Sequence, residues 1–204
     1  MKEESDYSRD LTEIRSMMER SSRFLSLSGL AGVMAGIYAL AGAYIAYNSF
    51  GFKPHTIAGD TVETWNFNRV ALLAIAVLLF ALGTAILLSW KKANKRGERL
   101  WNATSRRVLV TMTVPLVTGG LFILILIWQG LVGLVAPCTL LFYGVALHSA
   151  SKFTYEEMKF LGLINIALGL IGACFIEYAV VCWAFGFGVL HIVYGIYLHY
   201  KYER

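Results

Sequence analysis

The fold is decided by an uncharged stretch of 44 residues, 108–151, which reads VLVTMTVPLVTGGLFILILIWQGLVGLVAPCTLLFYGVALHSAS. A helix needs about 20 mostly apolar residues to cross the hydrocarbon core of a bilayer. The stretch is therefore long enough for two crossings, and Gln129-Gly130 near its middle supplies the turn between them. This pattern is typical of a membrane protein whose chain crosses the bilayer more than once.

Four more stretches of the 204-residue chain contain no Asp, Glu, Lys or Arg: 24–52, 70–90, 160–176 and 178–200. A single charged residue, Glu177, separates the last two, so they predict another tight pair of helices. Six membrane-spanning helices are expected, at 24–47, 70–90, 108–128, 131–150, 159–177 and 179–200. The expected fold class is all-α: a polytopic membrane protein with six transmembrane helices arranged as three hairpins.

The composition favours the membrane over a soluble helical fold. Hydrophobic residues make up 57% of the chain and charged residues only 15%, whereas soluble domains carry about 25% charged residues. Six apolar helices joined by short turns would leave a soluble protein almost no polar surface. The 23 mixed-charge residues at the start differ from a secretory signal peptide, which has a short basic start and an apolar run of about 7–15 residues. The first helix is therefore expected to remain as an anchor.

Lysine and arginine predict the orientation. Of the 18 basic residues, 16 fall on the side that holds both termini, and only Lys53 and Arg69 fall opposite. By the positive-inside rule, both termini lie in the cytoplasm. Residues 24–204 then form one transmembrane domain with an outer loop at 48–69 and a basic cytoplasmic loop at 91–107. The net charge of +5 reflects this topology, so the expected partners are membrane lipids and no nucleic acid.

Residues 1–23 predict a cytoplasmic amphipathic helix that leads into the first transmembrane helix. Small residues then recur on one face of that first helix, namely Gly29, Gly32, Gly36 and Ala43. Such a face lets another helix backbone approach closely, and close packing drives helix association in membranes. The face fits packing inside the six-helix bundle, or a seam with a second copy of the chain or another membrane protein.

The chain also contains a candidate internal repeat. Residues 143–148 read YGVALH and residues 194–199 read YGIYLH, and Gly120-Leu121 corresponds to Gly169-Leu170. The second and third hairpins are therefore candidate parallel repeats of about 50 residues, with a weaker third copy from Gly83 to Lys91. Chance similarity between apolar helices is the alternative.

One polar layer is expected within the bilayer, where ionisable groups are costly and often functional. His191 and Tyr194 lie three residues apart on one helix face, and Asn165, Tyr143 and Thr113 fall at similar depth on other helices. Burial in lipid favours a neutral imidazole that donates one N–H and accepts one hydrogen bond. The layer is either a set of hydrogen bonds that holds the helices of the bundle together or a ligand-binding site.

No catalytic motif is present in the sequence. The patterns CxxC, HExxH, GxSxG and the Walker loop are all missing, so no catalytic residue, metal ligand or cofactor is predicted. His148 and His199 lie at the expected inner boundary, where their equivalence follows from the repeat. Cys138, Cys174 and Cys182 are expected to be free thiols that pack as small apolar groups.

Two stretches carry a resemblance to a known group of proteins. Residues 24–32, FLSLSGLAG, and residues 186–195, GFGVLHIVYG, resemble small six-helix inner-membrane proteins of Bacteroidetes-type bacteria, a family without an assigned function. The resemblance implies a bacterial inner membrane. A weaker likeness is to the S components of energy-coupling-factor vitamin transporters, which carry an AxxxA packing motif in their first helix; the pairs Ala31/Ala35 and Ala39/Ala43 fit that spacing.

Two classes of function follow from these patterns. The first is a non-enzymatic helix-packing or signalling module, favoured by the glycine-rich helix faces. The second is a small-molecule-binding membrane protein or transporter that uses the polar layer around His191. An enzyme is the least favoured class, because no group of reactive residues supports one.

Overall fold

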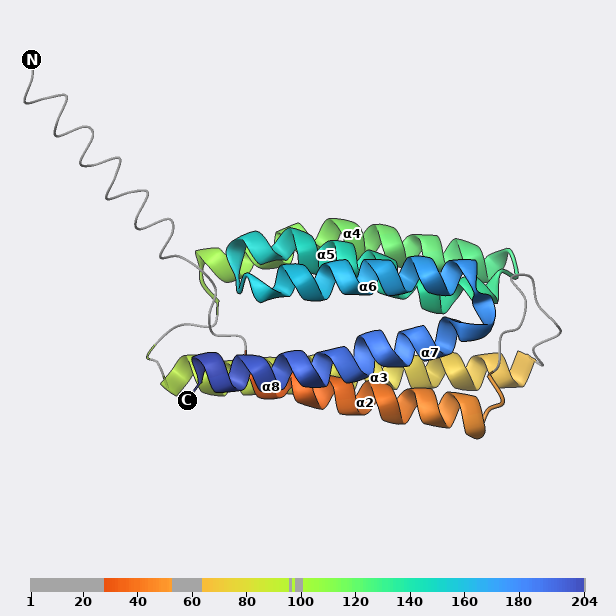
Figure 1. Ribbon diagram of the computed structural model, residues 1–204, viewed down its shortest axis with the longest axis horizontal. Helices are drawn as coiled ribbons and strands as arrows, with labels where there is room; N and C mark the ends of the chain where they lie inside the picture. The colour runs from red at the N-terminus through yellow and green to blue at the C-terminus, as the bar shows by residue number, and fades with distance from the viewer. Residues whose placement is uncertain (1–27, 53–63, 96, 98–100, 204) are drawn as a thin grey trace, which may run out of the picture.

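The computed structural model describes residues 28–52, 64–95, 97 and 101–203 (Figure 1). All regular structure in these residues is helical, and they include six helices that are each long and apolar enough to cross a membrane. The expected all-α class is thus confirmed, and the six helices have the length and apolar composition of a multi-pass membrane protein. The cytoplasmic helix expected at 1–23 lies outside the described residues, as does most of the loop at 48–69.

The spans are built from the following elements. The first three are α2 (Gly29–Asn48), α3 (Thr64–Lys95) and α4 (Ala103–Trp128). The fourth consists of η1 (Val132–Leu134), α5 (Val135–Ala150) and η2 (Ser151–Phe153), and the fifth is α6 (Glu157–Cys174). The sixth runs through η3 (Ile176–Tyr178), α7 (Ala179–Trp183), the π-helix η4 (Ala184–Val189) and α8 (Leu190–Tyr202).

Local chemistry explains where these helices begin and end. Helix α2 starts at Gly29 because Ser28 is extended, with φ −84° and ψ 130°. Helix α3 continues past its apolar run through Lys92 and Lys95, since cations near a helix C-terminus are favourable to the helix dipole. A capping box between Asn102 and Ser105 starts α4. The basic loop expected at 91–107 is therefore shorter, because helices occupy both of its ends.

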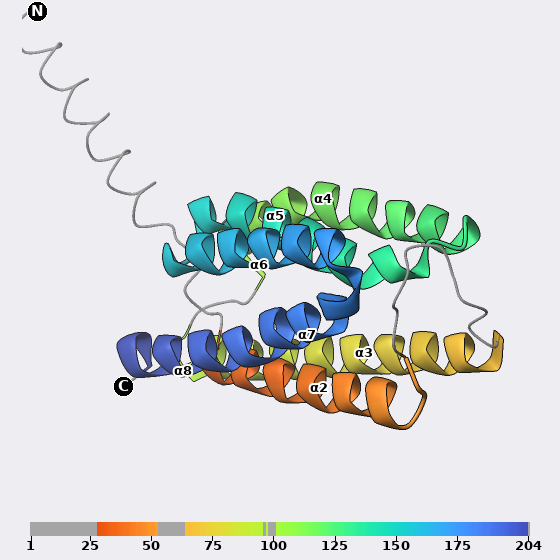
Figure 2. The same ribbon diagram turned by 45° about the vertical axis from the view of Figure 1, so that its right-hand side comes forward.

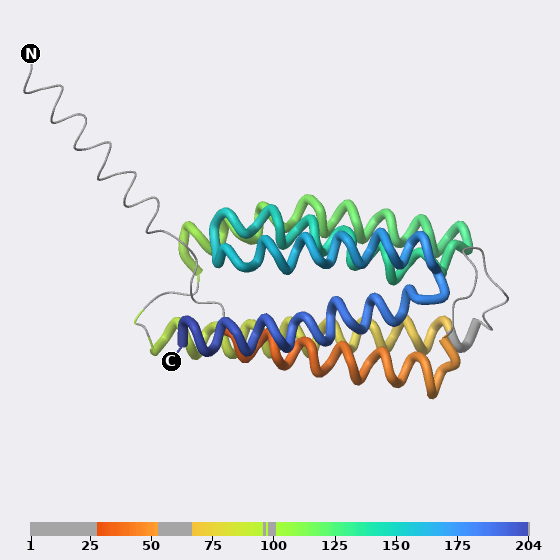
Figure 3. The backbone as a smooth tube through the Cα atoms, viewed as in Figure 1, coloured from red at the N-terminus to blue at the C-terminus, as the bar shows by residue number. Residues whose placement is uncertain are grey.

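The helices form two layers (Figures 1 and 2). In one layer α5 packs against both α4 and α6, and in the other α2 packs against both α3 and α8. Helix α7 packs against α5 and α6, so the sixth span begins at the first layer and ends in the second. The tube in Figure 3 follows this passage from the end of α6 to the layer of α2 and α3.

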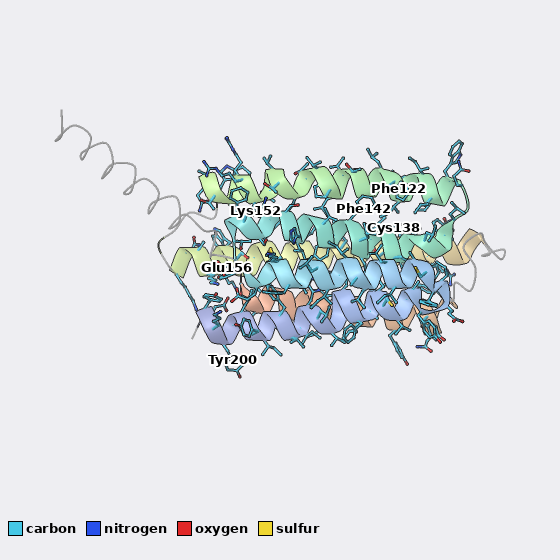
Figure 4. The ribbon with its side chains drawn as sticks, turned by 45° about the horizontal axis from the view of Figure 1, so that its top comes forward. Phe122, Cys138, Phe142, Lys152, Glu156 and Tyr200 are labelled. Atoms are coloured by element: carbon cyan, nitrogen blue, oxygen red, sulfur yellow. The ribbon has the colours of Figure 1, made fainter. Side chains whose placement is uncertain are left out.

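The two ends of the bundle differ in chemistry. Figure 4 places Lys152, Glu156 and Tyr200 at one end of the helices, where the described chain also begins and ends. We call it the basic end. In the half away from the basic end, Phe122 of α4 and Phe142 of α5 pack with their ring centroids 5.9 Å apart (Figure 4).

Candidate functional site

His191 lies at the centre of a buried hydrogen-bonded layer. Its side chain is 6% exposed, its Nδ1 is 2.8 Å from the carbonyl oxygen of Gly186, and its Nε2 is 2.9 Å from the hydroxyl of Tyr143. A carbonyl can only accept, so Nδ1 carries the proton. Burial disfavours the charged imidazolium, and in the neutral ring Nε2 accepts from the tyrosine hydroxyl. Both nitrogens are engaged by protein groups.

The backbone carbonyl that His191 binds belongs to the π-helix η4. In η4 the hydrogen-bond register is wider than in an α-helix, and such bulges are frequent at functional positions. A Cβ on Gly186 would lie 2.5 Å from Leu140 Cδ2 and 2.8 Å from Asn165 Oδ1, so both side chains would have to shift. Glycine thus lets the sixth span approach α5 and α6 closely enough for His191 to reach Tyr143.

Aromatic rings continue the layer away from the basic end. Phe187 lies 5.8 Å from His191, nearly parallel to it, and its centroid is 4.9 Å from Tyr143 and 5.0 Å from Trp183. The indole N–H of Trp183 donates to Thr139 Oγ1 at 3.0 Å. The Thr139 hydroxyl in turn donates to the carbonyl of Ala136 at 2.6 Å. A continuous column therefore runs from His191 to Thr139.

The other residues expected in the polar layer take different positions. Asn165 is fully buried and donates to the Leu161 carbonyl at 2.8 Å, while its Oδ1 has no hydrogen-bond partner among the described residues. The hydroxyl of Tyr194 is likewise buried without a partner there, and its ring packs against the core that Leu147 and Leu161 help to form.

Thr113 does not join the layer, which corrects the sequence-based grouping. It is exposed on α4 and donates to the carbonyl of Leu109 in its own helix at 2.8 Å. Similar depth along the bilayer placed it with His191, but depth does not determine rotation about the helix axis. Of the candidate ligand residues, the structure brings His191 and Tyr143 into contact and sets Asn165 beside Gly186.

An apolar cavity of about 150 Å³ lies beyond Trp183, between the two layers. Its lining comes from α2, α3, α5 and α7, with Phe52 and the residues Gly42, Ala43, Ala46, Val70, Leu73, Ala74, Val77, Val135, Ala136, Thr139, Val180 and Trp183. The two lining side chains that carry polar atoms, Thr139 and Trp183, satisfy one another as described above. The lining of the cavity is therefore almost entirely hydrocarbon, and the cavity is open on part of its surface.

Sequence analysis missed this cavity. It arises where small residues of α2, such as Ala43 and Ala46, face alanines of α3 and α5 across the space between the layers. Small residues on one helix predict close packing in general, and only the three-dimensional arrangement shows which of them lack a neighbour. Ala43, expected at a packing seam, is buried and also lines the cavity.

The other small residues of α2 lie against the sixth span. A Cβ added to Gly29 would lie 2.5 Å from the carbonyl oxygen of Gly195, and one added to Gly36 would lie 2.6 Å from that of Gly188. At Gly32 the nearest atom, Gly195 Cα, would be 3.2 Å away. This face is thus occupied within the chain itself.

A charged cluster ties three spans together at the basic end. The carboxylate of Glu203 accepts from the backbone N–H of Gly29 at 2.7 Å, from Lys92 Nζ at 2.9 Å and from His199 Nδ1 at 2.6 Å. Burial raises the pKa of Glu203, but the hydrogen bonds from these three groups and the charge of Lys92 hold it below its ordinary value. Lys201 and Tyr202 also bind Glu157 at the start of α6.

Glu203 and Glu157 were not among the residues that the sequence singled out. Charges at helix ends are ordinary, so nothing in the pattern separated them from solvated residues. Among the described residues, no group of three or more His, Cys, Asp or Glu could hold a metal ion, and the three cysteines are free. His148 and His199 lie on different helices, and His199 binds Glu203.

Comparison with protein-family models, with curated proteins and with solved structures finds no match to this chain. The function therefore has to be argued from the cavity, the layer around His191 and the charged cluster at the basic end.

Proposed function

We propose that this chain is a non-enzymatic membrane protein that binds an apolar small molecule in the cavity beyond Trp183. The observation that carries the proposal is the cavity itself, which measures about 150 Å³ and has an apolar lining. A cavity of this size lined by aliphatic and aromatic side chains stays dry and takes up benzene or xenon. Water is a poor occupant, because it needs two to four polar partners.

The layer around His191 packs against the residues that line one end of the cavity. Both imidazole nitrogens are engaged by Tyr143 and Gly186, which leaves neither free to bind a ligand. Phe187 packs between His191 and Trp183, and Trp183 lines the cavity. The proposed small-molecule site is therefore the cavity beyond Trp183 and not the polar layer. The layer holds Phe187 and Trp183 in position.

The test uses Trp183 as a reporter, with the other four tryptophans replaced by phenylalanine. Bromobenzene, a heavy-atom quencher of benzene-like shape, should quench Trp183 in purified protein with saturable binding. Ala46→Leu fills the cavity and should abolish saturable quenching. Ala41→Leu, on the exposed face of the same helix, is the matched control and should leave it intact. Equal, non-saturable quenching in all three proteins would contradict the proposal.

A second candidate is a signalling or interaction module that acts through the segment before α2. The specific observation is that Glu203 binds the first turn of α2, the end of α3 and His199 of α8. A displacement of α2 would therefore be transmitted to α3 and α8. A photo-crosslinker at Arg20 in native membranes should then give a defined partner that Glu203→Gln removes. A crosslinking pattern independent of Glu203 would count against this candidate.

We also propose a bacterial inner membrane with both termini in the cytoplasm. The support is the asymmetry of charge among the described residues. Lys152 lies at the basic end (Figure 4), Lys92 and Lys201 bind Glu203 and Glu157 there, and Arg69 lies at the start of α3. The resemblance to inner-membrane proteins of Bacteroidetes-type bacteria supports the choice of membrane. Lipids are then the immediate partners of the exposed apolar helix faces.

Finally, we propose that the chain consists of three hairpins, α2–α3, α4–α5 and α6–α8, and that the last two are true repeats. Support comes from two glycines at equivalent positions, Gly144 and Gly195, 51 residues apart. A Cβ on Gly144 would meet the carbonyl oxygen of Gly162 at 2.6 Å, and one on Gly195 would meet that of Gly29 at 2.5 Å. Both crossings are thus glycine on glycine.

A further inference from the structure

The two glycine crossings correspond residue by residue beyond the glycines themselves. Next to Gly144 lies Ile166, and next to Gly195 lies Val33; Ile166 and Val33 each follow their partner glycine by four residues. Two helical turns further along α6, a Cβ on Gly169 would contact Pro137 and Leu141 of α5. The equivalent Gly36 meets Gly188 and Ile192, each 51 residues after its counterpart. The crossing of α5 with α6 and the crossing of α8 with α2 are therefore the same structure built twice.

The same correspondence defines a third crossing, between α3 and α4. Gly83 of α3 is the counterpart of Gly144, as the weaker copy from Gly83 to Lys91 indicates, and Gly120 of α4 is the counterpart of Gly169. Nothing lies within 4 Å of a Cβ built on either Gly83 or Gly120. Helix α3 packs against α2 and has no comparable packing against α4. The third seam is thus open.

One position of the open seam differs from the two closed crossings in residue type. The position of α4 that corresponds to Gly162 is Thr113, 49 residues earlier. At the two closed crossings glycine faces glycine, and a Cβ on either partner would come within 2.7 Å of the opposing backbone. Thr113 carries a branched side chain at the position where both closed crossings leave no room even for a Cβ.

We propose that this open seam between α3 and α4 is the lateral opening of the cavity, and that the ligand is the hydrocarbon chain of a membrane lipid. The inference rests on the proposed function and names its ligand class. Val70, Leu73, Ala74 and Val77 of α3 line one wall of the cavity, and Val135 and Ala136 line the facing wall. These walls belong to the helix that borders the seam and to the helix packed behind α4.

The chemistry of the walls selects a hydrocarbon chain. The polar atoms at the cavity, the Thr139 hydroxyl and the Trp183 indole N–H, are satisfied by each other and by the Ala136 carbonyl. A ligand with a hydroxyl, amide or charge inside the cavity would lose its own hydrogen bonds to water without replacement, which costs on the order of 1–3 kcal/mol for a neutral group. A methylene chain has no such groups, and the surrounding bilayer supplies it.

The experiment closes the seam chemically. Gly83→Cys and Thr113→Cys are introduced into a protein that lacks Cys138, Cys174 and Cys182 and retains Trp183 as its one tryptophan. A disulfide requires the two Cα atoms to come within about 7 Å, so its formation brings α3 and α4 together. The protein is reconstituted in vesicles of phosphatidylcholine whose acyl chains carry bromine. Lipid quenching of Trp183 should occur in the reduced protein, disappear on oxidation and return with dithiothreitol.

A second variant tests the role of Thr113 without a crosslink. Thr113→Gly should let α3 and α4 pack and should lower lipid quenching of Trp183. Thr111→Gly on the same helix makes the same change in helix propensity and is the control that should leave quenching unchanged.

The outcomes separate this inference from the proposed function. Lipid quenching that persists in fully crosslinked protein, or that Thr113→Gly leaves unchanged, overturns the seam as the opening. Saturable quenching by bromobenzene without any quenching by brominated lipid overturns the lipid chain as ligand and leaves the cavity proposal standing. If neither probe quenches Trp183, the proposed function itself fails.

Discussion

The backbone N–H of Gly29 donates to the carboxylate of Glu203 at 2.7 Å, joining the first turn of α2 to the residue that follows α8, 174 positions later in the chain. The N-cap residue Ser28 supplies no side-chain hydrogen bond to this helix start. Glu203 takes over that role, and its negative charge is favourable at the positive end of the helix dipole. The last described residue of the chain thus completes its first described helix.

Removing this charge should destabilise the fold in a pH-dependent way. Glu203→Gln leaves Lys92 without its carboxylate partner at the 2.9 Å contact, and hydrogen bonds to charged groups contribute about 1.5–3 kcal/mol. Because the folded pKa of Glu203 lies below its ordinary value, the stabilisation is fully present above about pH 4.3, the ordinary pKa of glutamate. It is lost as the pH falls through the lower, folded value.

Thermal unfolding of detergent-solubilised protein between pH 3 and pH 7 checks this. Wild type should lose stability on acidification more steeply than Glu203→Gln, and the two should converge at low pH. Glu177→Gln, at an exposed position at the opposite end, serves as the control and should follow wild type. Parallel curves for wild type and Glu203→Gln would refute the role of this carboxylate.

His191→Leu should destabilise the bundle more than His191→Gln. Leucine leaves the Tyr143 hydroxyl and the Gly186 carbonyl without their partner, and each lost hydrogen bond within a membrane costs on the order of 1 kcal/mol. Glutamine retains a donor and an acceptor and should keep much of the stability. Thermal unfolding of the two variants measures the difference. A leucine variant as stable as wild type would show that the hydrogen bonds of His191 do not stabilise the bundle.

The sequence predicts some features of this molecule better than others, for identifiable physical reasons. The six spans follow from uncharged runs, because bilayer thickness imposes a length that no loop can satisfy. His191 stands out because an ionisable group is rare in such a run, and Tyr143 was grouped with it correctly by depth. Thr113 was grouped wrongly, since depth carries no information about which way a helix is turned.

Other features depend on contacts between distant segments. The cavity exists because Ala46, Ala74 and Ala136 meet across three helices, and no local pattern marks that meeting. Glu203 sits among the charges that any helix end carries, so its contact with Gly29 needed the fold. The π-helix at Gly186 was hidden as well, because two glycines near a histidine also occur in ordinary packed helices.

The glycines divide into two groups that alanine substitution should separate. Gly36→Ala places a methyl group 2.6 Å from the Gly188 carbonyl oxygen, so it should destabilise the protein by forcing α2 away from the sixth span. Gly83→Ala meets open space and should be neutral or stabilising by up to about 1 kcal/mol, because alanine favours helix more than glycine does. Gly32→Ala should fall between them. Thermal stability of the three variants decides, and equal effects at 36 and 83 would contradict the packing described above.

Cysteine labelling should place both chain ends in the cytoplasm. In a background without native cysteines, a cysteine at Asp60 should react with an impermeant maleimide in intact cells, whereas one at Asn94, in the last turn of α3, should react only after permeabilisation. Asp60 lies outside the described residues, so its exposure is expected from the sequence alone. The opposite labelling pattern would reverse the topology.

The most direct test of the central claim is an experimental structure of the protein purified from native membranes in lipid nanodiscs. We predict elongated density that runs from the bilayer between α3 and α4 into the space bounded by Ala46, Val77, Ala136 and Trp183. A structure in which α3 packs directly against α4, or in which side chains fill that space, would contradict the account.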